Sequence, residues 1–191
     1  MDARHERARR IQRRLESFYE LEAGPDVTEY VRDAEAGERE TLFVRENEGA
    51  LELALLLPVN DASARLDHHA QLVEGVSHFV YVAERARVEL PATELELELQ
   101  AEVDKFVVLA FEGTRLDAAR ARQASRALYG NVRHLHAEET ERGHRYRLAA
   151  TLAARVAGRL RTRSPGAQAL AFLRRFYRVG QAEKIRLATA W

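Results

Sequence analysis

Two long helical patterns with a single proline between them restrict the range of folds open to this chain. Between His69 and Arg87 the apolar residues recur at helical spacing, which predicts a helix with one face turned toward a core. A second helical pattern follows Pro91 and continues to Phe111. Because helices joined by a short connection pack as antiparallel neighbours, we predict a central antiparallel helical hairpin over residues 69–111.

The start of the second helix is ambiguous, since residues 94–99, ELELEL, alternate with the period of a strand. The alternation ends after Leu99, whereas the 3.6-residue period continues to Phe111. Thr93 and Glu96 also have the spacing of a capping box, in which each side chain accepts a hydrogen bond from the backbone amide of the other. We therefore predict a helix that begins after Thr93.

Residues 41–58 carry the clearest strand pattern of the chain. Leucines recur at every second residue from Leu51 to Leu57, and Asn47-Glu48-Gly49 before them is typical of a turn. This pattern predicts a β-hairpin that ends at Pro58, because proline cannot donate to a strand ladder. An isolated hairpin is marginally stable in water, so we expect its leucine face to pack on helices or on another strand.

The remaining segments are mostly helical in pattern. Residues 2–22 predict an amphipathic N-terminal helix, and Asp26 is placed to cap a short helical piece that extends to Val31. Residues 115–191 form a basic half with several helical patterns and a short strand at 131–135. A chain of 191 residues, 46% of them apolar, can bury a core of its own. The fold class that we predict is α+β, predominantly helical, with residues 1–191 as a single globular domain.

Composition excludes several classes of protein. The chain has no cysteine, which excludes disulfide scaffolds, cysteine metal sites and thiol catalysis. No apolar run approaches the roughly 18 residues that a transmembrane helix needs, and the N-terminal residues have no secretory apolar region, so we expect a cytoplasmic location. No motif for dinucleotide, nucleoside triphosphate, hydrolase or zincin chemistry occurs, and we predict no cofactor.

Charge is distributed unevenly along the chain although it sums to zero. Residues 1–114 contain 13 basic and 25 acidic side chains, and residues 115–191 contain 17 basic and 5 acidic ones. The positive half can contact phosphate or an acidic partner, or the two halves can neutralise each other within the fold or between subunits. Neutralisation is the simpler interpretation. Since 28 of the 30 basic residues are arginine, a single arginine is weak evidence of a binding role.

A candidate anion-binding surface lies in the basic half. We expect Arg147, Arg155, Arg159 and Arg163 near one side of a helix, away from its apolar face. The residues that we predict to bind an anion are Arg145, Arg147, Arg155 and Arg159. The first two lie near the start of that helix, where a cation is unfavourable beside the macrodipole unless a negative group compensates for it. A bound anion could compensate, and so could the acidic residues of segment 138–141.

A candidate polar cluster lies on the two helices of the predicted hairpin. Its members follow one another at helical spacing: Glu74, His78 and Tyr81 on the first helix, and Glu98 and Glu102 on the second. If these faces meet, a carboxylate could orient the imidazole for acid–base catalysis, or the group could hold a metal ion. The single Glu-x-x-x-His pair falls short of the paired motifs of a di-iron bundle. We therefore favour a hydrogen-bonded histidine or a solvent-exposed face, and predict no metal.

Three functions fit these observations. The first is a non-enzymatic binding or regulatory module whose basic C-terminal half contacts an acidic protein, nucleic acid or a phosphorylated ligand. The second is an enzyme or metal-binding protein that uses the Glu/His/Tyr cluster between two helices. The third is a structural protein that self-assembles through its acidic and basic halves into a salt-sensitive homo-oligomer. We favour the first, and we expect no membrane partner.

Overall fold

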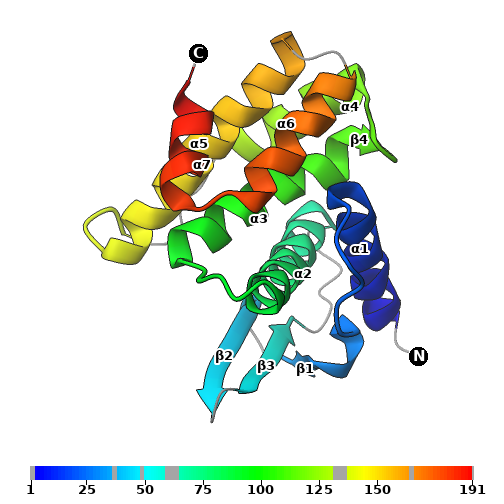
Figure 1. Cartoon of the computed structure of the whole chain (residues 1–191), viewed down its shortest axis with the longest axis vertical. Coiled ribbons are helices and arrows are strands. Elements are labelled where there is room, and N and C mark those ends of the chain that lie inside the picture. The colour runs from blue at the N-terminus through cyan, green and yellow to red at the C-terminus, as the bar shows by residue number, and fades with distance from the viewer. Residues whose placement is uncertain are drawn as a thin grey trace. The chain divides into compact units, whose positions relative to one another are not determined.

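The computed structural model describes residues 3–35, 38–47, 50–58, 65–130, 137–163 and 166–190 (Figure 1). This described part is predominantly helical and contains two small sheets, so the predicted α+β class is confirmed. The chain divides into two compact units. Unit 1 comprises Met1–Ser17 and Leu21–Pro91, and unit 2 comprises Phe18–Glu20 and Ala92–Trp191. The single globular domain expected from the sequence stays a prediction.

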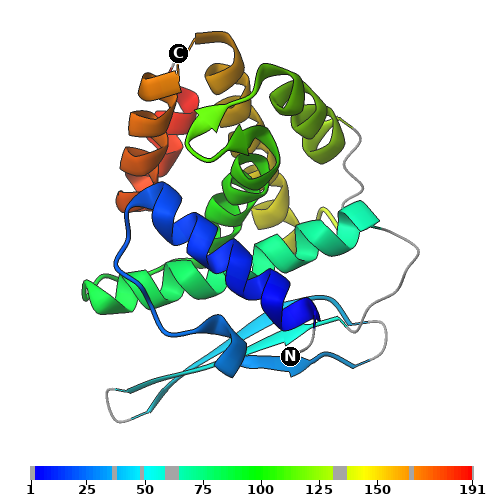
Figure 2. The same ribbon diagram turned by 90° about the vertical axis from the view of Figure 1, so that its right-hand side faces the viewer.

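Unit 1 contains a three-stranded sheet with the strand order β1-β3-β2. Its strands are β1 (Val31–Asp33), β2 (Thr41–Asn47) and β3 (Ala50–Leu57). β2 and β3 pair antiparallel as a long hairpin, and the shorter β1 pairs parallel to β3 (Figure 2). The hairpin confirms the strand pattern of residues 41–58, while its expected turn residues 48 and 49 lie outside the described part.

Helix α2 (Arg65–Arg87) packs on this sheet through a glycine. A Cβ atom at Gly75 would lie 2.9 Å from Leu55 Cδ1 and 3.2 Å from Leu57 Cδ2, so the absence of a side chain brings the helix close to β3. Both leucines are buried there. Leu55 and Leu57 of the alternating set therefore pack on a helix, as the sequence predicts.

Helix α1 (Ala3–Tyr19) confirms the amphipathic N-terminal pattern but ends before the predicted boundary at residue 22. Glu20 has a φ of 53°, a left-handed conformation that ends the helix. Asp26 then caps a single 3-10 turn, η1 (Val27–Glu29), by accepting a hydrogen bond from the amide of the second turn residue. The helical piece expected as far as Val31 is thus shorter than predicted, because β1 begins at that residue.

Unit 2 is built from helices around α3. Its elements are α3 (Glu94–Ala110), β4 (Phe111–Glu112), β5 (Arg115–Leu116), α4 (Ala118–Tyr129), α5 (Glu141–Arg163), α6 (Gly166–Arg178) and α7 (Gln181–Thr189). Helix α3 packs against α4, α5 and α7, and α4 packs against α5. A tight turn at Gly113, whose φ is 55°, joins β4 to β5. This pair was not predicted from the sequence, because two-residue strands carry no alternation.

Helix α3 shows that the ambiguous ELELEL segment is helical. Thr93 Oγ1 accepts from the Glu96 amide at 3.2 Å, and the Glu96 carboxylate accepts from the Thr93 amide at 2.8 Å, which completes the predicted capping box. Further along, Leu99, Val103 and Phe106 are buried at helical spacing. Both helices of the expected hairpin are therefore confirmed. Their antiparallel packing stays a prediction, because α2 belongs to unit 1 and α3 to unit 2.

The core of unit 2 contains a buried polar network. Lys184 of α7 is 0% exposed and donates to Gln100 Oε1 at 2.6 Å and to the carbonyl of Phe176 at 2.7 Å. Gln100 Nε2 donates to Asp104 at 2.9 Å, and the same carboxylate accepts the hydroxyl of Tyr19. Burial raises the pKa of Tyr19 well above its usual value, and the charge of Asp104 raises it further. The network links α7 to α3 with every buried charge hydrogen-bonded, as a low-dielectric core requires.

No helix within the described ranges is both long enough and apolar enough to cross a membrane. The short strand expected at residues 131–135 lies outside those ranges.

Candidate functional site

Arg145 and Arg159, both predicted to bind anions, have partners within unit 2. Arg145 of α5 forms an ion pair with Glu94 of α3, with Nη1 2.6 Å from Oε2. The guanidinium of Arg159 lies 4.5 Å from the ring centroid of Phe172, and its Nη1 lies 3.5 Å from the carbonyl oxygen of Leu187. Both guanidinium groups therefore contribute to the packing of unit 2.

The other two predicted residues differ in exposure. Arg147 is half-buried, as Arg145 and Arg159 are, whereas Arg155 is exposed on α5. Arg161, further along the same helix, is exposed as well. Of the four arginines predicted to form an anion site, Arg155 is thus the one that is open to solvent.

Helix α4 carries exposed arginines that the sequence analysis did not select. Arg120, Arg122 and Arg126 are exposed, and α4 contains no acidic residue after its N-cap, Asp117. Arg122 and Arg126 are one turn apart and share one face of the helix. Neither has an ion-pair partner within the part of the chain that the structure describes. The signal was present in the sequence as three arginines without an intervening acid in residues 118–129.

The N-cap residue of α4, Asp117, provides a carboxylate close to Arg120. The Asp117 carboxylate accepts a hydrogen bond from the Arg120 amide at 2.7 Å, and this bond lowers the pKa of Asp117, as do the positive charges of Arg120 and Arg115. The ionised cap also balances part of the charge at this end of the helix. Arg122 and Arg126, by contrast, have no acidic residue near them on α4, because the helix contains none after Asp117.

Arg175 and Arg186, two other exposed arginines of unit 2, are paired. Glu183 accepts a hydrogen bond from Arg186 at 2.6 Å and one from Arg175 at 2.8 Å. The bond from Arg186 has the larger effect, and together the two arginines lower the pKa of Glu183 to about 2. Arg174 pairs with Glu20 at 2.6 Å. Unit 2 nevertheless holds 18 basic and 12 acidic residues, a net charge of +6. The unpaired arginines of α4 and α5 are part of that surplus.

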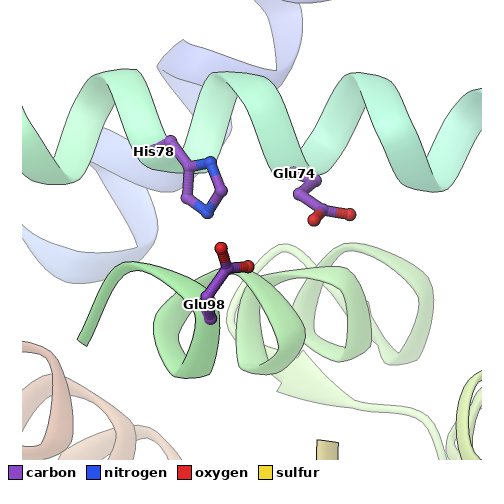
Figure 3. Close-up of side chains that lie close together, drawn as sticks. All are labelled: Glu74, His78 and Glu98. Atoms are coloured by element: carbon purple, nitrogen blue, oxygen red, sulfur yellow. The ribbon is translucent and has the colours of Figure 1, made fainter. Parts of the chain in front are cut away.

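The acid–base candidates on α2 lie one helical turn apart. Glu74 and His78 project from the same side of the helix (Figure 3). Glu74 is buried and His78 half-buried. Tyr81 is fully buried, and the Arg85 guanidinium lies 5.6 Å from its ring centroid. Helix α2 therefore presents one carboxylate and one imidazole on a common face.

The remaining members of the predicted cluster lie on α3. Glu98 is buried, and Glu102 is half-buried with its carboxylate 2.6 Å from Lys105 Nζ. The backbone carbonyl of Glu102 also accepts the hydroxyl of Tyr129 at 2.9 Å. Since α3 belongs to unit 2 and α2 to unit 1, a single cluster of all five predicted residues stays a prediction.

Comparison with known proteins offers no precedent for either set of residues. No protein-family model, curated protein sequence or solved structure matches this chain. The chemistry of the exposed side chains is therefore the basis on which its function is argued.

Proposed function

We propose that unit 2 is a non-enzymatic binding module that contacts a phosphate-rich polyanion, with nucleic acid as the favoured class. The observation that carries this proposal is the exposed pair Arg122 and Arg126 on α4, which has no ion-pair partner in the described part of the chain. Arg155 and Arg161 add two exposed guanidinium groups on α5, the helix that packs against α4. Unpaired positive charges on neighbouring helices attract a polyanion.

The side chains of α4 favour phosphate over a folded acidic protein as the ligand. A guanidinium is planar, always protonated and able to donate two parallel hydrogen bonds to one phosphate. The exposed residues among these arginines include Ala119, Gln123 and Ala127, which are small or neutral and leave room for a nucleic-acid backbone. A protein interface, by contrast, is built around aromatic or large apolar anchors, which α4 does not expose.

The same face lacks the means to recognise bases. The aromatic residue of α4, Tyr129, is half-buried and donates its hydroxyl to the carbonyl of Glu102. Without an exposed ring to stack on a base, the contacts are confined to sugar and phosphate. We therefore expect binding that is independent of sequence and strongly dependent on salt.

Fluorescence anisotropy with a labelled random-sequence DNA duplex tests this proposal. Arg122→Ala with Arg126→Ala removes two phosphate contacts, so we expect weaker binding and a plot of log K against log salt that is shallower by about 2 units. The matched control is Arg175→Ala with Arg186→Ala, which removes the same charge from arginines that Glu183 already pairs. We expect this control to bind nearly as the wild type does.

Three outcomes would contradict the proposal. Equal losses in both double variants would show that net charge, and not the face of α4, governs binding. No salt-dependent binding by the wild type would exclude a phosphate-binding role. Displacement of the duplex by an acidic peptide at matched charge would instead favour an acidic protein as the partner.

The acid–base or metal-binding alternative rests on the one-turn spacing of Glu74 and His78 on α2. A stoichiometric metal ion in the purified protein, lost in His78→Gln, would favour that alternative over the binding module.

A further inference from the structure

Unit 1 contains a cleft of about 150 Å³ among α1, the segment 21–25 and the C-terminal half of α2. Its floor is apolar and includes Leu21, Phe79, Val80 and Ala83. A cavity of this volume accommodates a molecule about as large as benzene. No arginine of unit 2 lines this cleft, and its apolar lining suits an occupant of different chemistry.

Hydrogen bonds hold the wall of the cleft in place. Gln12 of α1 is 4% exposed, donates its Nε2 to the carbonyl of Pro25 at 2.8 Å, and accepts the amide of Val27 at 2.9 Å. Glu16, one turn later, accepts the amide of Gly24 at 3.1 Å. These bonds fasten the connecting segment to α1. The site is therefore preformed, so ligand binding costs little free energy for reordering this segment.

The rim of the cleft is negatively charged. Four charged side chains line the cleft: the carboxylates of Glu16, Glu22 and Glu84 and the guanidinium of Arg87. Arg87 lies 2.8 and 3.0 Å from the two oxygens of Glu84 and 3.3 Å from Glu22. One cation does not balance three anions, so the rim keeps a net negative charge.

Glu16 is the carboxylate best placed for a ligand. The hydrogen bonds from Gln12 and Gly24 both go to its Oε1. Its Oε2 accepts none from the described residues. This second oxygen belongs to a side chain that lines an apolar cleft, where a charge interacts more strongly than in open water.

We propose that this cleft binds a small organic ammonium ion, with the nitrogen on Glu16 and the apolar body on the floor formed by Phe79, Val80 and Ala83. The negative rim repels anions. A neutral molecule of the same size gains the apolar contact but not the ion pair. A free amine and the side chain of a lysine in a peptide share this chemistry.

Nuclear magnetic resonance titration of the ¹⁵N-labelled full chain with benzylamine tests the proposal. We expect saturable shifts of the Gly24 and Ala83 amides, binding of benzyl alcohol weaker by roughly tenfold, and no binding of phenylacetate. Equal affinity for benzylamine and benzyl alcohol, or no saturable shift with benzylamine, would overturn the proposal.

Variants separate the charge from the shape of the cleft. Glu16→Gln keeps an acceptor oxygen for the Gly24 amide but removes the charge, so benzylamine should bind roughly tenfold more weakly. Glu6→Gln, an exposed position of α1 outside the cleft, should bind as the wild type does. Ala83→Leu fills the floor and should abolish binding while amides far from the cleft keep their shifts. An unchanged affinity in Glu16→Gln would overturn the proposal.

A last comparison identifies the source of the amine. Butylamine and N-acetyl-lysine amide carry the same alkylammonium group, but the second also carries a peptide backbone. Binding of butylamine alone supports a free amine as the ligand, and equal binding of both supports a lysine side chain. Failure of butylamine to bind at all would count against the proposal.

Discussion

The imidazole of His69 on α2 is partly buried near two arginines of α1. Burial lowers the pKa of His69 below its usual value of about 6.5, and the positive charges of Arg7 and Arg14 lower it further. The folded chain therefore favours the neutral imidazole. Protonating it costs more in the folded state than in the unfolded state.

Stability should fall on acidification through this residue. An unfolded chain takes up the proton near pH 6.5, whereas the folded chain takes it up only at a lower pH. The contribution of neutral His69 is therefore complete above about pH 6.5 and is lost as the pH falls through the folded pKa. In urea denaturation, we expect His69→Gln to lose less free energy of unfolding than the wild type between about pH 7 and about pH 5.

The adjacent substitution His68→Gln is the control, because it makes the same chemical change one position earlier on α2. An equally steep decline in His69→Gln and wild type would contradict the assignment to His69.

Which arginines are available to a ligand could be predicted only in part. Arg145 pairs with Glu94, which lies on another helix far away in the sequence, so no local pattern indicates this contact. The exposed pair of α4 is different. Arg122 and Arg126 lie in a segment with no acidic residue after Asp117, a local signal that the sequence carried although these two arginines were not predicted from it.

At the scale of single elements, the start of α3 depends on its capping box. Thr93 Oγ1 accepts the Glu96 amide and also donates to Gln181 Oε1 at 2.7 Å. We expect Thr93→Ala to lower the free energy of unfolding by about 1 kcal/mol, because the amide at the helix start loses its acceptor. Thermal and urea denaturation measure this change.

Thr93→Ser keeps the hydroxyl and should recover most of the stability. If Thr93→Ser were as unstable as Thr93→Ala, the loss would come from the methyl group of the threonine and not from the cap.

The length of an element decided whether its sequence predicted it. The helical period of α2 and α3 continues over many residues and identified both helices, although residues 94–99, ELELEL, alternate with the period of a strand. β1, β4 and β5 have two or three residues each, too few to show an alternation. The pairing of β1 with β3 depends on tertiary contacts, which residue order does not reveal.

Across the whole molecule, opposite charges are divided between the units. Unit 1 holds 12 basic and 18 acidic residues, a net charge of −6, and unit 2 carries +6. This division allows self-assembly through opposite charges as well as ligand binding. The two differ in how the molar mass should respond to salt.

If the unpaired arginines bind a ligand, as we propose, and not a second copy of the chain, light scattering should give the same molar mass at low and at high salt. Addition of a nonspecific oligonucleotide should raise the mass at low salt, and added salt should reverse the increase. An oligomer that dissociates in salt and ignores the oligonucleotide would favour the self-assembly alternative.

The buried network of unit 2 also limits which covalent modifications can reach the chain. The chain has two lysines, Lys105 and Lys184, and both are buried, Lys184 completely. Enzymes that acetylate or ubiquitinate lysine, like dyes and crosslinkers that react with lysine, need an accessible side-chain amine. The folded molecule offers them none, although 30 of its side chains are basic, so lysine-directed labelling would report on local unfolding of α3 or α7.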